Sequence, residues 1–160
     1  MAVLAPFRGI FYDQKTIKDI ALVVTPPYDI ISKEEQEKYY KRHPYNIIRL
    51  VLGKDLPEDN DRINKYSRAA NHLETWQNES FLIKDTLPYI FYYKQEFTIK
   101  KDQKKTRKGF IAIIKLEDFT SGVVLPHEKT MTGPKSDRLR LIESCNANLS
   151  PIFSLYSDPE

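Results

Sequence analysis

Residues 88–119, "PYIFYYKQEFTIKKDQKKTRKGFIAIIKLEDF", decide that this chain contains β-structure. Two runs rich in aromatic and β-branched residues, 88–100 and 108–119, flank the basic segment 101–107. Such runs favour strands, so this pattern predicts a β-hairpin with a basic tip. A charged hairpin end discourages edge-to-edge aggregation, and cations on a β-ribbon can also contact nucleic acid phosphates. The sequence leaves both interpretations of the tip open.

Four shorter segments predict further strands. Residues 20–25 form a short apolar run rich in β-branched side chains, and Pro26 and Pro27 end it because neither can donate to a strand ladder. Residues 46–53, "NIIRLVLG", predict a second, buried strand. The other two segments are 121–126, "SGVVLP", and 150–158, "SPIFSLYSD".

Two helices are predicted between these strands. Ser32 and Glu35 have the spacing of a capping box, which predicts a helix that runs to about residue 42 and ends at His43-Pro44. Residues 62–79 predict a longer helix, because apolar residues recur there at steps of three and four. The residues of this stripe are Ile63, Tyr66, Ala70, Leu73 and Trp76.

The composition is typical of one compact globular domain over residues 1–160, with 41% hydrophobic and 29% charged residues. A net charge of +3 gives little support to nucleic acid binding, and Cys145, the single cysteine, excludes an internal disulfide. No apolar run is long enough to span a membrane, so we expect a cytoplasmic protein without membrane contact. The segments together predict an α+β fold, with a mixed, largely antiparallel sheet and two to three helices.

Residues 125–143, "LPHEKTMTGPKSDRLRLIE", hold the first candidate site. We expect a helix over 136–144 with Ser136 as its N-cap. A turn through Gly133 and Pro134 would aim free amides at a negatively charged group, and Lys135 and Arg138 would add positive charge. The alternative is a capped surface helix whose cations are solvated.

Titratable residues lie in the segment 125–143 and in a second candidate loop, at Tyr28 and Asp29. His127 can exchange protons near neutral pH and Glu128 can orient it, or His127 is simply a polar loop residue. Asp29 follows the double proline and can orient a hydroxyl or a metal-bound nucleotide, or it can form an Asx turn. The three histidines, His43, His72 and His127, show no metal-ligand spacing, so no metal site is predicted.

Five blocks in a fixed order resemble one family. They are "VTPPYDIIS", "HPYNIIRLVLG", "FIAIIKLEDF", "PHEKTMTGPKSDRLRLIE" and "NANLSPIFSLYSD". Together they resemble the N-terminal region of the family catalogued as domain of unknown function 1015, over nearly the whole chain. Longer members carry an Asp-Gly-His-His-Arg motif downstream, which these residues lack. The resemblance therefore implies an N-terminal fragment of a longer protein.

The resemblance also implies a ParB/sulfiredoxin-like fold and a superfamily that contains nucleotide-using enzymes. We therefore expect nucleotide or phosphate binding, or phosphoryl transfer to a small hydroxyl substrate by a kinase-like enzyme using a nucleotide with Mg²⁺. Asp29, His127 and Glu128 would be the catalytic residues, and Gly133, Lys135, Ser136 and Arg138 would bind phosphate. The alternatives are a nucleic-acid-associated regulator that uses the basic hairpin, and a non-catalytic interaction domain.

Overall fold

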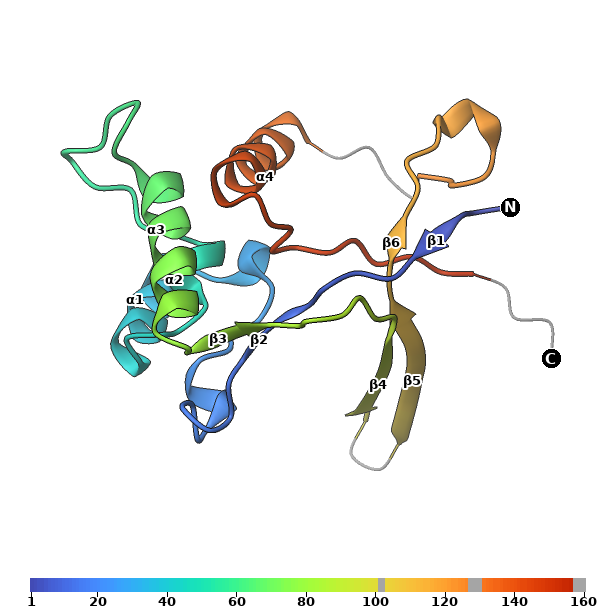
Figure 1. The fold of residues 1–160 in the computed structure, drawn as a ribbon, viewed down its shortest axis with the longest axis horizontal. Helices are drawn as coiled ribbons and strands as arrows, with labels where there is room; N and C mark the ends of the chain where they lie inside the picture. Colours follow the sequence, from blue (N-terminus) through green and yellow to red (C-terminus); the bar gives the residue numbers. More distant parts are fainter. Residues whose placement is uncertain (101–102, 127–130, 157–160) are drawn as a thin grey trace. The chain divides into compact units, whose positions relative to one another are not determined.

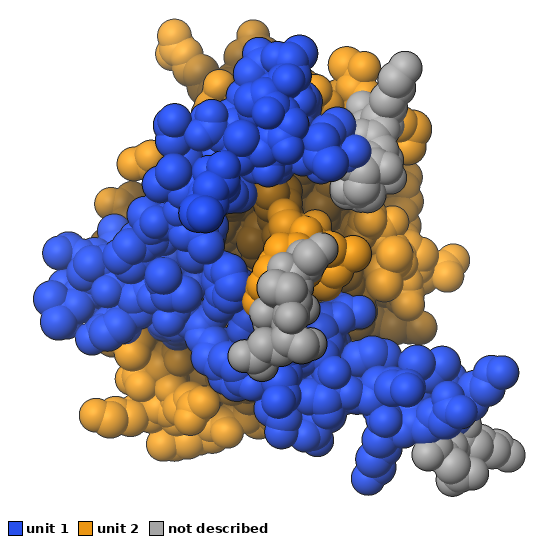
Figure 2. Space-filling model, turned by 90° about the vertical axis from the view of Figure 1, so that its right-hand side faces the viewer, with its two compact units in different colours: residues 1–11, 84–129 blue, residues 12–83, 130–160 orange. Residues whose placement is uncertain are grey.

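The computed structural model describes residues 1–100, 103–126 and 131–156. The chain forms two compact units (Figure 2): unit 1 comprises residues 1–11 and 84–129, and unit 2 comprises residues 12–83 and 130–160. Its helices and small antiparallel sheets make an α+β fold, as the sequence predicts. The expectation of a single domain stays a prediction.

Among the described residues, the strands form three two-stranded sheets instead of one mixed sheet (Figure 1). The pairs are β1 (Leu4–Ala5) with β6 (Ile113–Ile114), β2 (Ile10–Tyr12) with β3 (Leu82–Lys84), and β4 (Phe91–Thr98) with β5 (Lys104–Ile111). Four of these strands have only two or three residues, too few to build a wide ladder. The predicted β-content is therefore present, but it is divided among small sheets.

The predicted hairpin is confirmed as β4 and β5 in unit 1, and its register runs from Phe91 opposite Ile111 to Thr98 opposite Lys104. Because β5 begins at Lys104, most of the predicted basic tip belongs to a strand. At the base of the hairpin the ring of Phe91 contacts the rings of Phe7 and Phe11, with centroids 5.0 and 5.2 Å away. These aromatic edge contacts hold the start of β4 in place.

The first helix of unit 2, α1 (Lys33–Arg42), confirms the predicted capping box. The Glu35 amide donates to the Ser32 hydroxyl at 3.2 Å, and the Ser32 amide donates to the Glu35 carboxylate at 2.9 Å. These bonds satisfy amides that a helix start leaves unpaired. The helix ends where His43 adopts an extended conformation before Pro44, as predicted.

The predicted strand over 46–53 is wrong, because Ile48–Val51 forms the short helix α2. Asn46 is fully buried and organises this turn. Its side-chain oxygen accepts from the Ile48 amide at 3.0 Å, and its side-chain nitrogen donates to the Leu22 carbonyl at 2.7 Å. Ile48 and Leu50 still enter the core, so the segment is as buried as expected but helical.

The predicted strand over 20–25 is also wrong. Residues Ile20–Leu22 form a short 3₁₀-helix, η1, since the Asp19 carboxylate accepts from the Ala21 amide at 3.0 Å and starts a turn. Val23, which follows η1, is fully buried. A second 3₁₀-helix, η2 (Tyr28–Ile30), follows the double proline.

The longest predicted helix is confirmed as α3 (Lys65–Asn78). The Asn64 side chain accepts from the amides of Tyr66 and Ser67, so the helix starts after Ile63, which is 60% exposed. Ala69, and not the predicted Ala70, belongs to the buried stripe. The buried residues of α3 are Tyr66, Ala69, Leu73 and Trp76.

The last helix, α4 (Thr132–Cys145), packs against α3, which also packs against α2. Leu141 is its buried residue. The predicted strands over 121–126 and 150–158 are wrong within the described residues, because neither segment forms a strand there. Phe119–Ser121 forms a 3₁₀-helix that ends at Gly122 with φ of 69°, and residues 150–156 have no regular secondary structure.

Candidate functional site

Helix α4 begins four residues before the predicted N-cap. Gly133 and Pro134 lie in its first turn, where an amide has no helical partner and proline is therefore tolerated. The Lys135 amide already donates to the Met131 carbonyl at 3.3 Å, and Ser136 lies inside the helix. The prediction of Ser136 as N-cap, with free amides around residues 136–138, is therefore wrong.

The predicted phosphate-binding residues separate on this helix. Gly133, Lys135 and Ser136 are exposed, whereas Arg138 is 17% exposed and lines a shallow hollow of unit 2. Asp29 is exposed in η2. His127 and Glu128 lie outside the described residues.

Arg138 brings together three sequence blocks that are far apart in the chain. Its guanidinium lies over the Tyr28 ring, 3.8 Å from the centroid, and one of its nitrogens donates to the Ser150 hydroxyl at 3.4 Å. A guanidinium stacks well on an aromatic face and keeps donors free at its edge. The loop of Tyr28 and Asp29 therefore lies beside α4, while Lys135 does not line the hollow.

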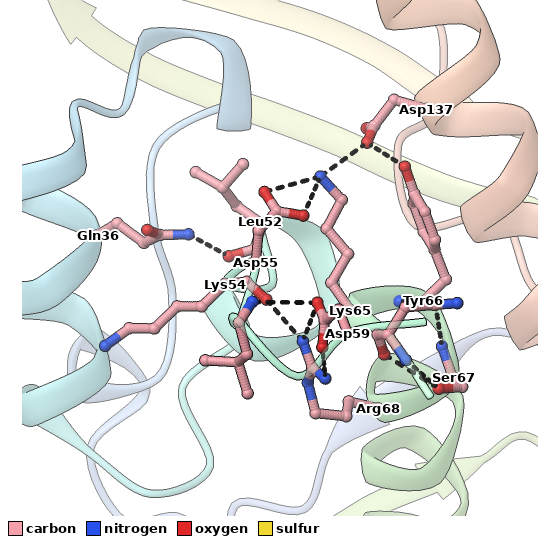
Figure 3. Close-up of polar contacts among 12 residues, drawn as sticks. Gln36, Leu52, Lys54, Asp55, Asp59, Lys65, Tyr66, Ser67, Arg68 and Asp137 are labelled. Atoms are coloured by element: carbon pink, nitrogen blue, oxygen red, sulfur yellow. Dashed lines mark hydrogen bonds and ion pairs between the residues drawn. The ribbon is translucent and has the colours of Figure 1, made fainter. Parts of the chain in front are cut away.

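Asp137 makes polar contacts with residues that line the hollow, and Figure 3 shows those with Lys65 and Tyr66. One carboxylate oxygen accepts from the Tyr66 hydroxyl at 2.7 Å and lies 3.6 Å from the Lys65 ammonium. The other accepts from Nε of Arg138 at 2.9 Å and also contacts its Nη2. Burial raises the pKa of Asp137, but the hydrogen bonds from Arg138 and Tyr66 outweigh this effect and hold it below its usual value. Asp137 is therefore ionised at neutral pH.

The pKa of the Tyr66 hydroxyl is raised to about 12, first by burial and then by its hydrogen bond to the Asp137 carboxylate. Tyr66 is 8% exposed, and Arg140 lies over its ring at 4.5 Å from the centroid. Tyr66 therefore stays protonated and acts as a hydrogen-bond donor that fixes Asp137.

Lys65 connects the hollow to solvent. Its ammonium lies 3.2 Å from Asp55, whose side chain is 79% exposed, and 3.6 Å from Asp137, which is 28% exposed (Figure 3). An ion pair with so exposed a partner contributes little to stability. Lys65 can therefore exchange Asp55 for another anion at small cost.

The walls of the hollow are mostly apolar. Residues 50–53, in and after α2, form one side, and α3 and α4 form the other. The lining residues are Leu50, Val51, Leu52, Gly53, Lys65, Tyr66, Arg138 and Leu141. The site thus combines an apolar wall with two cations, an arrangement that suits an anion attached to a less polar group.

A second polar cluster next to the site is structural. Arg68 forms a forked ion pair with Asp59, and its Nη2 also donates to the Lys54 carbonyl at 2.7 Å (Figure 3). The hydrogen bonds from Arg68 are the main reason that the pKa of Asp59 is lowered. This pair ties the loop after α2 to α3 and so fixes the wall of the hollow.

A comparison with models of protein families shows which family the chain belongs to. Residues 4–160 match the model described as "Protein of unknown function (DUF1015)". The chain belongs to this family. No curated protein and no solved structure matches the chain. The resemblance predicted from the five sequence blocks is confirmed at the level of the DUF1015 family.

Two residues of this candidate site were missed by sequence reasoning. Lys65 was not singled out, and Tyr66 was assigned only to an apolar helix stripe. The one available signal was a tyrosine on that stripe, because a buried hydroxyl needs a partner. Its partner Asp137 lies 71 residues away in the sequence, so spacing could not reveal it.

In the part of the chain that the structure describes, no group of three or more histidine, cysteine, aspartate or glutamate residues is placed to hold a metal ion. No described helix has both the length and the apolar character needed to cross a bilayer.

Proposed function

We propose that this DUF1015 chain is a ParB/sulfiredoxin-like domain that binds the phosphate groups of a nucleotide at the hollow between α2, α3 and α4. The observation that carries the proposal is the position of Arg138. Its guanidinium lies on Tyr28 and lines the same hollow as Lys65. One block that the family resemblance singles out supplies the cation Arg138 and another supplies the Tyr28 ring beneath it, while Lys65 lies outside the five blocks.

The chemistry of the two cations supports a phosphate ligand. Arginine offers a planar fork that matches two phosphate oxygens, and lysine offers a compact charge that follows a third. The half-buried side chains of Val51 and Leu52 border the hollow and can contact the less polar part of a nucleotide. The phosphate ligands of this site are Arg138 and Lys65. Lys135, which is exposed and does not line the hollow, has only a minor role in binding.

Ligand entry requires an exchange of partners. Lys65 releases Asp55, which remains solvated because its side chain is 79% exposed. Asp137 keeps Tyr66 and holds Arg138 in place through its Nε and Nη2, while Nη1 exchanges its long hydrogen bond to Ser150 for one to the phosphate. The cost is small, because a weak surface pair and one long hydrogen bond are replaced by charge-assisted bonds.

Phosphoryl transfer is the reaction class that we assign to this site, with a small hydroxyl compound as acceptor and Mg²⁺ on the nucleotide. Asp29 supports this assignment, because it is exposed and directly follows Tyr28, whose ring lies under Arg138. A carboxylate there can orient a hydroxyl or bind the metal of a nucleotide.

The test is a thermal-shift screen of the chain with ATP, CTP and GTP, each with and without Mg²⁺. A ligand at a hundred times its Kd adds about 2.7 kcal/mol to the free energy of unfolding, which raises the midpoint by roughly 5 to 10 °C. The Lys65→Gln variant should bind the active nucleotide at least about tenfold more weakly, since hydrogen bonds to charged groups contribute about 1.5–3 kcal/mol.

Lys18→Gln is the matched control, because Lys18 is an exposed cation of the same unit outside the hollow. It should bind as the unaltered chain does. The absence of a shift with all three nucleotides, or equal losses in the two variants, would contradict the proposed site.

A further inference from the structure

The β4–β5 hairpin of unit 1 presents aromatic and cationic side chains on both faces, and on one face three lysines accompany Tyr92, the most exposed ring of the hairpin. Its register places Tyr92 opposite Phe110, Lys94 opposite Lys108 and Thr98 opposite Lys104. Residues directly opposite in an antiparallel pair point to the same side, and every second residue of a strand shares that side. We call this surface the Tyr92 face; its residues are Tyr92, Lys94, Glu96, Thr98, Lys104, Thr106, Lys108 and Phe110.

The Tyr92 face carries uncompensated positive charge. Its three lysines face one carboxylate, Glu96, whose nearest oxygen lies 2.7 Å from the Lys94 ammonium. Both side chains of this pair are at least half exposed, so water weakens their attraction. Lys94 and Lys108 stand directly opposite each other, and opposed like charges destabilise a strand pair. A bound anion would relieve this repulsion.

Tyr92 lies beside this charge and is 70% exposed. Phe110, opposite it, is 42% exposed, so the two rings form an accessible aromatic step next to Lys94 and Lys108. Same-face residues repeat about every 7 Å along a strand. Rings and cations in such a row suit a chain in which flat bases accompany regularly placed phosphates. A membrane surface would need a broader apolar area than these two rings.

We propose that the Tyr92 face binds single-stranded nucleic acid, with a base stacked on Tyr92 and phosphates held by Lys94, Lys104 and Lys108. This site lies in unit 1 and is independent of the nucleotide site proposed in unit 2. Sequence reasoning placed Lys104 in the basic hairpin tip, and Lys94 and Lys108 in the two predicted strand runs. The register instead puts them on the same face of the two strands.

The other face of the hairpin supplies a matched control. Lys105 lies opposite Phe97 and belongs to that second face, three residues from Lys108 on the same strand. Lys105→Gln and Lys108→Gln remove the same charge from the same strand and differ only in the face affected. Tyr92→Thr removes the ring but retains a residue with high strand propensity.

The experiment measures fluorescence anisotropy of a labelled 16-nucleotide thymidine strand with the full chain at 50, 100 and 200 mM salt. Three phosphate contacts on a single strand predict a slope of about −2 for log K against log salt. Lys108→Gln should reduce its magnitude by roughly 0.7, and Lys105→Gln should leave it unchanged. Tyr92→Thr should weaken binding roughly 5- to 150-fold, the range for one base stack, with the slope unchanged.

Three outcomes would overturn the proposal. The first is no binding at 50 mM salt. The second is an equal effect of Lys105→Gln and Lys108→Gln on the slope, which would show non-specific attraction to the whole hairpin. The third is tighter binding to a duplex of the same length, or to phosphatidylserine vesicles, than to the single strand. Circular dichroism of each variant shows whether the hairpin has folded, and the two lysine variants keep the test decisive if Tyr92→Thr does not fold.

Discussion

Replacing Tyr66 with phenylalanine removes one oxygen atom and so tests the hydrogen bond between Tyr66 on α3 and Asp137 on α4. The hydroxyl donates to the Asp137 carboxylate at 2.7 Å from a ring that is 8% exposed. Phenylalanine keeps the packing of the ring in the buried stripe of α3. The variant therefore isolates the bond between α3 and α4.

The expected loss is about 1.5 kcal/mol of unfolding free energy. A hydrogen bond to a charged group contributes about 1.5–3 kcal/mol. The lower end applies because the Asp137 side chain is 28% exposed and water can replace the lost donor. Urea unfolding followed by the fluorescence of Trp76 measures this loss, since Trp76 is the only tryptophan and is 3% exposed on α3.

The control is Tyr39→Phe on α1. Tyr39 is half-buried under Arg42, and its hydroxyl makes no hydrogen bond within the described ranges of the chain. A loss below about 0.5 kcal/mol for Tyr66→Phe, or a loss equal to that of Tyr39→Phe, would refute the assignment of a stabilising bond.

The pH dependence of stability gives a second check on the bond between Tyr66 and Asp137. The lowered pKa of Asp137 means that its contribution is present above pH of about 4 and is lost as the pH falls through the folded value. The difference between Tyr66→Phe and the unaltered chain should therefore shrink in acid.

Three further predictions concern stability. Ser32→Ala should cost about 1 kcal/mol by removing the acceptor of the Glu35 amide, which urea unfolding followed by circular dichroism at 222 nm can measure; an unchanged midpoint would contradict the capping box. Arg68→Lys should lower the thermal midpoint although the charge is kept, because lysine cannot fork across Asp59, and equal midpoints would show that charge alone suffices. The pKa of Tyr66, raised to about 12, means that the folded state keeps a proton that the unfolded chain loses near pH 10. Stability should therefore fall between about pH 10 and 12, and urea midpoints at pH 9, 10 and 11 should decline less steeply in Tyr66→Phe.

Features that depend on residues close in sequence were predictable. The capping box of α1 needs only Ser32 and Glu35, three positions apart, and the β4–β5 hairpin needs two strand-forming runs around a short turn. The α3 stripe was also predicted, with a shift of one position at Ala69, because its exact phase is set by the Asn64 cap. Local hydrogen bonds and periodicity are written directly in the order of the residues.

The errors arose where an apolar run had two possible structures. Residues 46–53 are rich in β-branched and aliphatic side chains, which favour a strand. The buried side chain of Asn46 instead bonds the Ile48 amide and the Leu22 carbonyl, and this contact between distant segments favours a helical turn. Propensity of a short apolar segment is weak, so tertiary contacts override it.

The sequence by itself determined the α+β fold class and the family, and it singled out the loop of Tyr28 and Asp29 and the segment that begins α4 as candidate site segments. Only the tertiary structure decided which of those residues meet. Arg138 reaches Tyr28 across the chain, Lys135 does not line the hollow, and Tyr66 finds Asp137 from another helix. The physical reason is that the first residue of a helix and the packing of that helix determine which way each side chain points. Both depend on contacts between residues far apart in the sequence.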